Sequence, residues 1–109
     1  MAIMNTDPEE RAENGTLPEA MAHWYSIRKS YPEDFLIAYR MGDFYEFFYD
    51  DAVRISQLVG ITLTGRGQGP NRHPLAGIPH KSAANYFKNL VRLGQTVVLV
   101  DQLEDPKTV

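Results

Sequence analysis

Residues 35–48 read FLIAYRMGDFYEFF, and this stretch decides the fold. Its first part, Phe35–Arg40, is a short apolar run bounded by polar residues, which is typical of a buried strand. Met41-Gly-Asp43 is a turn signal, and the aromatic run Phe44–Phe48 follows it directly. We therefore predict two strands joined by a tight turn, which together form a β-hairpin.

Three helices are predicted around this hairpin. Thr16-Leu-Pro-Glu19 fits a capping box, so the first helix should begin there and end near Ser30. Asp50 is the expected N-cap of a second helix that ends at Gly60. A third helix should begin at its N-cap, Ser82, and run to residue 93. The residues expected to face the core are Ala52, Val53, Ile55, Leu58 and Val59 in the second helix and Tyr86, Phe87, Leu90 and Val91 in the third.

Further strands are predicted between and after these helices, over residues 61–64 and 74–78. Thr96–Val100 is a β-branched run that should lie deep in the sheet. This order favours an α/β fold, a single domain with a mixed β-sheet covered by about three helices. We expect the domain over residues 16–109 and interpret the polar, acidic residues 1–15 as a disordered leader.

The composition fits one globular domain outside the membrane. The chain of 109 residues is long enough for one domain and too short for two. No apolar run approaches the ~18 residues of a membrane span, and the start does not resemble a signal peptide. The lack of cysteine excludes disulfides and thiolate metal sites. We therefore expect a cytoplasmic protein.

The charge is distributed unevenly along the chain. The net charge is −3, which by itself argues against binding to nucleic acid. Residues 1–20, however, hold five acidic side chains and one arginine, a net −4, so residues 21–109 carry +1. One half of the domain is positive, which suits a polyanion, although basic residues also form ordinary solvated surfaces. Positions 52–100 hold no acidic residue and six basic ones: Arg54, Arg66, Arg72, Lys81, Lys88 and Arg92.

The sequence offers few candidates for a catalytic site. There is no Gly-rich phosphate loop, so ATP hydrolysis by this chain is not expected. No zinc-site spacing links the histidines, which are His23, His73 and His80. Four carboxylates close in sequence would suit a Mg²⁺-dependent nuclease: Asp43, Glu46, Asp50 and Asp51. Asp43 fits a turn, Asp50 fits an N-cap and Asp51 fits the start of a helix. Glu46 has no such structural explanation.

Glu46 shares one face of its predicted strand with an aromatic ring. Side chains alternate along a strand, so Phe44 and Glu46 point to one face and Tyr45 and Phe47 to the other. A core face rarely carries a glutamate. The face of Phe44 and Glu46 is therefore either an ordinary solvated surface or a ligand-binding surface, and the pattern leaves both open.

Four ordered motifs resemble the N-terminal domain of bacterial MutS proteins. The resemblance covers roughly residues 18–109. It implies the α/β fold of that domain, and it implies DNA with mispaired or unpaired bases as the partner, with no enzymatic activity in this chain. The motifs are Arg40-Met-Gly-Asp-Phe-Tyr-Glu46 with Phe48–Ala52, Ile61–Gly67, Leu75–Pro79 with Tyr86, and Asp101–Pro106.

The resemblance also implies roles for individual residues. In this family the Phe of the Phe-x-Glu motif enters DNA from the minor groove and stacks on a mispaired base, and the Glu hydrogen-bonds the displaced base. Phe44 and Glu46 occupy these positions, and one hypothesis is that Glu46 acts in its protonated form. Backbone contacts are implied mainly for Arg66. The expected DNA-binding set is completed by Met41, Gly42, Arg72 and Lys81.

The chain departs from the family in several places. Lys81 stands where the family commonly has a His, and Gly65 where it often has a second basic residue. The chain also ends before the connector, core, clamp and ATPase domains of the full-length family, in which ATP, Mg²⁺ and a MutS protein dimer take part. We therefore expect no cofactor and a monomer, either as a fragment or as a free-standing module. A free-standing module would bind deformed DNA or, alternatively, a protein partner.

Overall fold

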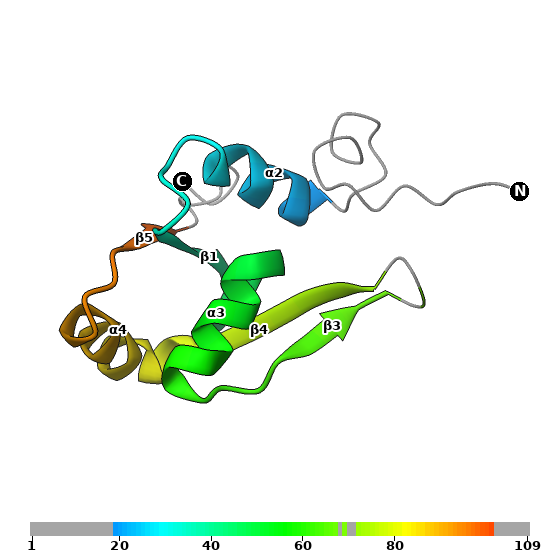
Figure 1. Cartoon of the computed structure of the whole chain (residues 1–109). Coiled ribbons are helices and arrows are strands. Elements are labelled where there is room, and N and C mark those ends of the chain that lie inside the picture. Colours follow the sequence, from blue (N-terminus) through cyan, green and yellow to red (C-terminus); the bar gives the residue numbers. More distant parts are fainter. Residues whose placement is uncertain (1–18, 68, 70–71, 102–109) are drawn as a thin grey trace, which may run out of the picture.

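A computed structural model describes residues 19–67, 69 and 72–101 of the chain. These residues form a five-stranded mixed sheet with the strand order β3-β4-β2-β1-β5. Helix α2 covers one face of the sheet, and helices α3 and α4 cover the other (Figure 1). The predicted fold class, a single α/β domain with a helix-covered mixed sheet, is confirmed. The predicted leader over residues 1–15 lies outside the described residues.

The predicted hairpin is present at the centre of the sheet. Strand β1 spans Leu36–Met41, and strand β2 spans Phe44–Phe48 in antiparallel orientation, with Met41 opposite Phe44. Only two residues remain for the loop. Gly42 is the first of these and has φ +58°, a backbone conformation that glycine adopts without a steric penalty.

Alternation along the hairpin strands sends their apolar side chains into two separate cores. Tyr45 and Phe47 face α3 and α4, where they pack in one cluster with Leu36 and Ala38. Phe48 faces α2 and packs in a second cluster with Met21, Trp24 and Ile37. Because both faces of the central strands are buried at this end, the hairpin is held from two sides.

The remaining antiparallel strands extend the sheet beyond β2. Strand β4 spans His73–Pro79 and pairs with β2, and strand β3 spans Thr64–Arg66 and pairs with β4. The predicted strand at 74–78 is confirmed. The bounds predicted for the strand over 61–64 are wrong. Ile61, which follows α3 in the chain, packs against the core, and pairing with β4 begins only at Thr64.

Strand β5, Val97–Val100, was predicted to lie deep in the sheet, and this prediction is wrong. It lies at the edge, paired in parallel with β1 alone among the described strands. Leu99 is 47% exposed. A β-branched run indicates a strand but does not distinguish a central position from an edge, because β-branched side chains suit any pleated, half-buried surface.

The three helices are found near their predicted positions, with different caps. Helix α2 spans Glu19–Arg28, α3 spans Tyr49–Val59, and α4 spans Ala83–Arg92 after a short 3₁₀ turn, η2, at His80–Ser82. Of the capping box predicted for α2, positions 16–18 lie outside the described residues.

Two predictions about the helix starts are corrected. Phe48, not Asp50, occupies the N-cap of α3, because the helix follows β2 without a connecting loop, and Asp50 lies in the first turn. Ser82 is at the N-cap of α4, but its side chain makes no capping hydrogen bond. Gly60 ends α3 in a left-handed conformation, as predicted.

The inward faces of the helices are largely as predicted. Ala52 and Ile55 are buried in α3, and Leu90 is buried in α4. Val53 and Val91 are the exceptions, since Val53 belongs to neither core cluster and 65% of Val91 is exposed. The buried stripe of α4 follows positions 83, 86, 87 and 90, and residue 91 lies one residue, about 100°, beyond it.

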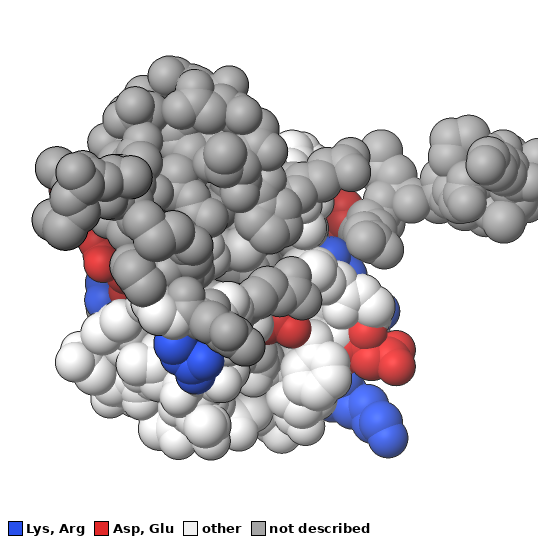
Figure 2. All heavy atoms as spheres, turned by 90° about the vertical axis from the view of Figure 1, so that its right-hand side faces the viewer, with Lys and Arg blue, Asp and Glu red and all other residues white. Residues whose placement is uncertain are grey.

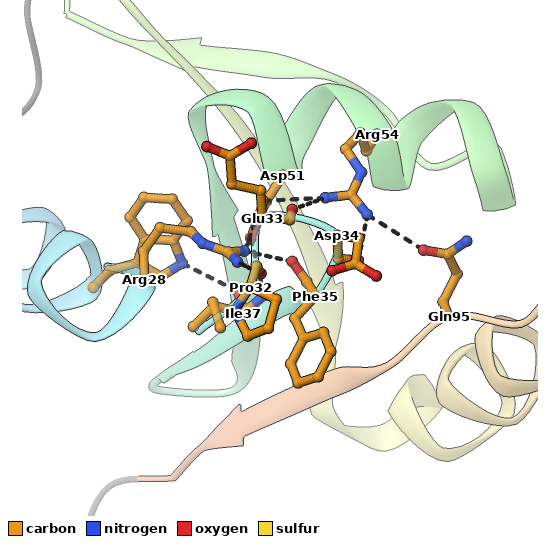
Figure 3. A network of polar contacts seen from close by, with 10 residues as sticks. Arg28, Pro32, Glu33, Asp34, Phe35, Ile37, Asp51, Arg54 and Gln95 are labelled. Carbon is orange, nitrogen blue, oxygen red and sulfur yellow. Dashed lines mark hydrogen bonds and ion pairs between the residues drawn. The ribbon is translucent and has the colours of Figure 1, made fainter. Parts of the chain in front are cut away.

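A buried ion pair fastens α2 to α3 and to the start of β1 (Figure 3). Arg28 Nη1 donates to Oδ2 of Asp51 at 2.9 Å, and the Ile37 amide donates to the same oxygen at 2.9 Å. Arg28 also donates to the carbonyls of Pro32 and Phe35. Burial raises the pKa of the Asp51 carboxyl, and the Ile37 amide and Arg28 oppose that rise. The carboxylate is therefore tolerated in the interior because of these donors.

A second polar contact joins the end of β5 to the hairpin. The Tyr45 hydroxyl donates to Oδ1 of Asp101 at 2.6 Å, and the Arg40 guanidinium lies 5.7 Å from the centre of the Tyr45 ring. Burial and the hydrogen bond to Asp101 raise the pKa of Tyr45 above its ordinary value of 10.0. This contact holds the edge strand against the strand pair that it borders.

We predict that Arg28→Met lowers the free energy of unfolding by about 3–5 kcal/mol, because it removes the guanidinium bonded to the buried Asp51 carboxylate and leaves only Arg54, 3.8 Å away, as a counter-charge. The side chains of Arg28 and Asp51 are only 12% and 5% exposed. Urea unfolding followed by circular dichroism measures the change. Lys88→Met, at an exposed position of α4, is the control and should stay within about 0.5 kcal/mol of the unaltered protein. Equal stability of both variants would contradict a structural role for the ion pair.

We predict that Asp101→Ala moves the pKa of Tyr45 back toward its ordinary value, because the substitution removes the acceptor and its negative charge. The neutral phenol is favoured in the folded state, so this contribution to stability is present below pH ~10 and is lost as the pH rises through the pKa of Tyr45. Ultraviolet titration of tyrosine ionisation, with Tyr45→Phe subtracted to isolate the signal, measures the shift. An unchanged titration of Tyr45 would contradict the contact.

Candidate nucleic-acid interface

The α2 face of the sheet is covered at one end and open at the other. Its side chains form rows that run across neighbouring strands, as the register shows. The Phe48 row, paired with Leu75, packs beneath α2. The next two rows, Tyr39–Glu46–Gly77 and Met41–Phe44–Pro79, lie progressively nearer the hairpin turn. We call these two rows the open rows, and they are the candidate interface.

Phe44 lies in the outer of the open rows, as the first residue of β2. It is 42% exposed, although strands β1 and β4 flank it on both sides. The sequence left open whether the face of Phe44 and Glu46 is solvated or binds a ligand. The structure confirms that Tyr45 and Phe47 are buried on the opposite face, while Phe44 presents its ring on an otherwise well-packed hairpin.

The hairpin turn beside Phe44 is held by two polar contacts. Arg40 Nε donates to the carbonyl of Gly42 at 2.6 Å, and the amide of His80 donates to the carbonyl of Asp43 at 2.6 Å. The second bond joins the turn to the segment after β4. The loop that carries Phe44 is therefore tied at both of its residues, which limits movement of the ring relative to the sheet.

Glu46 lies in the inner open row, above the backbone of β4. A Cβ atom on Gly77 would lie 2.8 Å from Oε2 and 3.3 Å from Oε1 of Glu46, closer than side chains normally approach. The carboxylate therefore occupies the space that any other residue at position 77 would fill. Glu46 is half-buried and lies next to Phe44 on the same face.

Tyr39 and His23 form the border between the open rows and α2. The Tyr39 hydroxyl lies 2.7 Å from Nδ1 of His23, and the two rings meet edge to face at 5.5 Å. Sequence reasoning did not select Tyr39, Gly77 or His23. Tyr39 was accessible from the hairpin pattern, because a two-residue loop places it opposite Glu46, whereas Gly77 and His23 depend on contacts between distant segments.

The predicted basic contacts are divided between the two ends of β4. Arg72 precedes β4, and its guanidinium lies across Gly65, where a Cβ atom would be 2.6 Å from Nε. Arg66 ends β3 opposite His73, and its side chain lies outside the described part of the structure. Phe44 pairs with Pro79 at the other end of β4, so about 20 Å of strand separates Phe44 from Arg66 and Arg72. Lys81 is exposed in η2, near the Phe44 end.

The charges do not merge into one basic field on the face shown in Figure 2. Lysine and arginine side chains there form separate groups with uncharged surface between them, and acidic side chains lie beside some of these groups. The described part of this face therefore offers a polyanion no continuous basic patch. Selectivity would then depend on contacts made at close range.

The carboxylates considered for a nuclease do not converge. Asp51 is bound by Arg28 and the Ile37 amide, whereas Glu46 lies over β4 on the open rows. Among the residues that the structure describes, no group of three or more His, Cys, Asp or Glu side chains could hold a metal ion. Within the same residues, no helix has the length and apolar character needed to cross a membrane.

Comparison with known proteins gives a consistent result. The family model described as MutS domain I matches residues 19–109. The DNA mismatch repair protein MutS of Lactococcus lactis is 49% identical over 88 residues, which are 80% of this chain and 10% of the relative. The MutS protein of Streptococcus pyogenes is 50% identical over 88 residues, with the same coverage. That of Streptococcus agalactiae is 45% identical over 93 residues, 84% of this chain and 11% of the relative.

The match includes every strand and helix that forms the open rows and their support. It extends from the first described residue of α2 to the end of the chain. The chain spans about a tenth of the length of the curated relatives that it matches. On the basis of the family model and these identities, the chain belongs to the MutS domain I family.

Proposed function

We propose that this domain recognises mispaired or unpaired bases in duplex DNA, with Phe44 as a wedge that enters the minor groove and Glu46 as the group that hydrogen-bonds the displaced base. The observation that carries the proposal is the placement of both side chains on the open rows. An exposed ring is mounted on a fastened two-residue turn, and a carboxylate lies beside it. The relatives named as DNA mismatch repair proteins support the same assignment.

The energetics favour binding to DNA with a mispaired or unpaired base over binding to a fully paired duplex. Inserting an apolar ring between base steps costs a few kcal/mol of lost stacking and kinks the duplex. A mispaired base is already poorly stacked, so the cost is smaller there, and stacking on the Phe44 ring returns about 1–3 kcal/mol. The Glu46 carboxylate is repelled by phosphates in every duplex, and at a mispair a hydrogen bond to the displaced base offsets that repulsion.

The basic residues have a different part in this proposal. Arg66 and Arg72 belong to the end of β4 that is remote from Phe44, so we assign them to phosphates away from the lesion. Lys81, Met41 at the end of β1 and Gly42 in the turn lie nearer the wedge, and we assign them to the backbone beside the lesion. Phosphate contacts position the domain, whereas Phe44 and Glu46 discriminate.

We predict that Phe44→Ala abolishes the preference for a duplex with one unpaired T over the matched duplex, because the ring supplies the stacking. Fluorescence anisotropy at low salt measures both affinities. Tyr31→Ala is the matched control, because Tyr31 is an aromatic residue of similar exposure, 41%, outside the open rows. It should keep the preference. If the unaltered domain prefers the lesion and Phe44→Ala still prefers it equally, Phe44 is not the wedge.

We predict that Arg66→Ala and Arg72→Ala weaken binding to matched and lesion duplexes alike, because phosphate contacts carry no information about the lesion. Each substitution should also reduce the dependence of log affinity on log salt concentration by about one. Titrations at several salt concentrations measure both effects. A selective loss of lesion binding in either variant would contradict this assignment.

A further inference from the structure

A glycine of the neighbouring strand lies beneath Glu46. Gly77 lies opposite Glu46 in the pairing of β2 with β4. Its missing side chain leaves the space in which the carboxylate lies, with Oε2 2.8 Å and the carboxyl carbon 3.2 Å from the place that a Cβ atom would take. The backbone of Gly77 is outside the left-handed region, so the chain path alone does not require a glycine there.

We propose that Gly77 is a positioning residue for lesion recognition, because its missing side chain lets the Glu46 carboxylate lie low over β4, on the same face as Phe44. This inference rests on the proposed function and adds a third residue to the pair that discriminates. Gly77 itself touches no base in this account. It acts only through Glu46.

The geometry gives this role a clear physical basis. An alanine at position 77 would place its methyl carbon 2.8 Å from Oε2 of Glu46, closer than side chains normally approach, so the carboxylate must move away from β4. This shift takes the carboxylate out of the position from which, under the proposed function, it reaches the displaced base. The same substitution causes little backbone strain, since strand conformations suit alanine. The effect of Gly77→Ala on lesion recognition therefore reports the placement of the Glu46 carboxylate.

A double-mutant cycle tests the proposal. The ratio of affinities for the unpaired-T and matched duplexes is measured for the unaltered protein, Gly77→Ala, Glu46→Ala and the double variant. Gly77→Ala should reduce the ratio by about tenfold, the worth of one hydrogen bond to a charged group. In the Glu46→Ala background it should change nothing further. An unreduced ratio for Gly77→Ala, or an equal reduction in both backgrounds, overturns the proposal.

Gly65→Ala is the matched control for this cycle. Gly65 is also a strand glycine outside the left-handed region, and a Cβ atom there meets the flexible Arg72 side chain instead of Glu46. Gly65→Ala should alter the affinities for both duplexes alike and leave their ratio unchanged. A reduced ratio in this variant would show that any methyl group added to the sheet affects recognition, and would overturn the specific role of Gly77.

Two further measurements keep the test decisive if Gly77→Ala folds poorly. Glu46→Asp withdraws the carboxylate from Gly77 without altering position 77, and it should reduce the ratio by a similar factor. An unreduced ratio for Glu46→Asp would show that the seat over β4 is not needed. In the free protein, nuclear Overhauser contacts between the Glu46 side chain and the Gly77 Hα protons should be present, and their absence also overturns the proposal.

Failure of the proposed function has a different signature. If the unaltered domain binds both duplexes equally, or if Phe44→Ala keeps the preference, the wedge assignment fails regardless of Gly77. If the unaltered domain discriminates and Phe44→Ala and Glu46→Ala both lose the preference, while Gly77→Ala keeps it, only the role of Gly77 fails.

Discussion

The ion pair between Arg28 and Asp51 determines which part of the sheet can serve as an interface. It joins the last turn of α2, the first turn of α3 and the start of β1 through donors from both Arg28 and Ile37 (Figure 3). Because α2 is fastened at this end, it covers the Phe48 row, while Tyr39 and Met41 pack at the margin of the same core cluster and Phe44 stays exposed. A helix shifted along the sheet would bury Phe44 and Glu46, and the exposed ring would be lost to the core.

Under the proposed function, the rigid attachment of the hairpin matters because the Phe44 ring must be held more rigidly than the base stack that it opens. A ring on a mobile loop would be displaced before it separated two base pairs. Ordering that loop on binding would also cost free energy and weaken the complex. Phe44 follows a two-residue turn whose carbonyls accept hydrogen bonds from Arg40 and from the amide of His80. Behind it, Tyr45 and Phe47 fill the opposite core. The exposed ring is therefore supported by buried neighbours on the same strand.

The hairpin and the partnership of Phe44 with Glu46 could be predicted from sequence because both depend on local rules, a turn signal and a two-residue alternation. Contacts between distant segments could not. Asp51 is 23 positions from Arg28. Its place at the start of a helix was a sufficient reason for an acidic residue, so nothing in the sequence indicated the ion pair. The space over Gly77 exists only once β4 is placed beside β2 in the observed register. The position of β5 at the edge likewise follows from the order of strands and not from its own residues.

The central claim is that the Phe44 ring stacks inside DNA at a lesion, and the ring itself provides the most direct test. The protein is labelled with ¹³C in its phenylalanine rings, the Phe44 signals are assigned with Phe44→Ala, and a duplex with one unpaired T is added. Stacking between bases should move the Phe44 signals strongly upfield, while the buried Phe47 and Phe48 signals stay in place and the matched duplex produces little change. Unmoved Phe44 signals in a domain that demonstrably binds the lesion duplex would contradict the account.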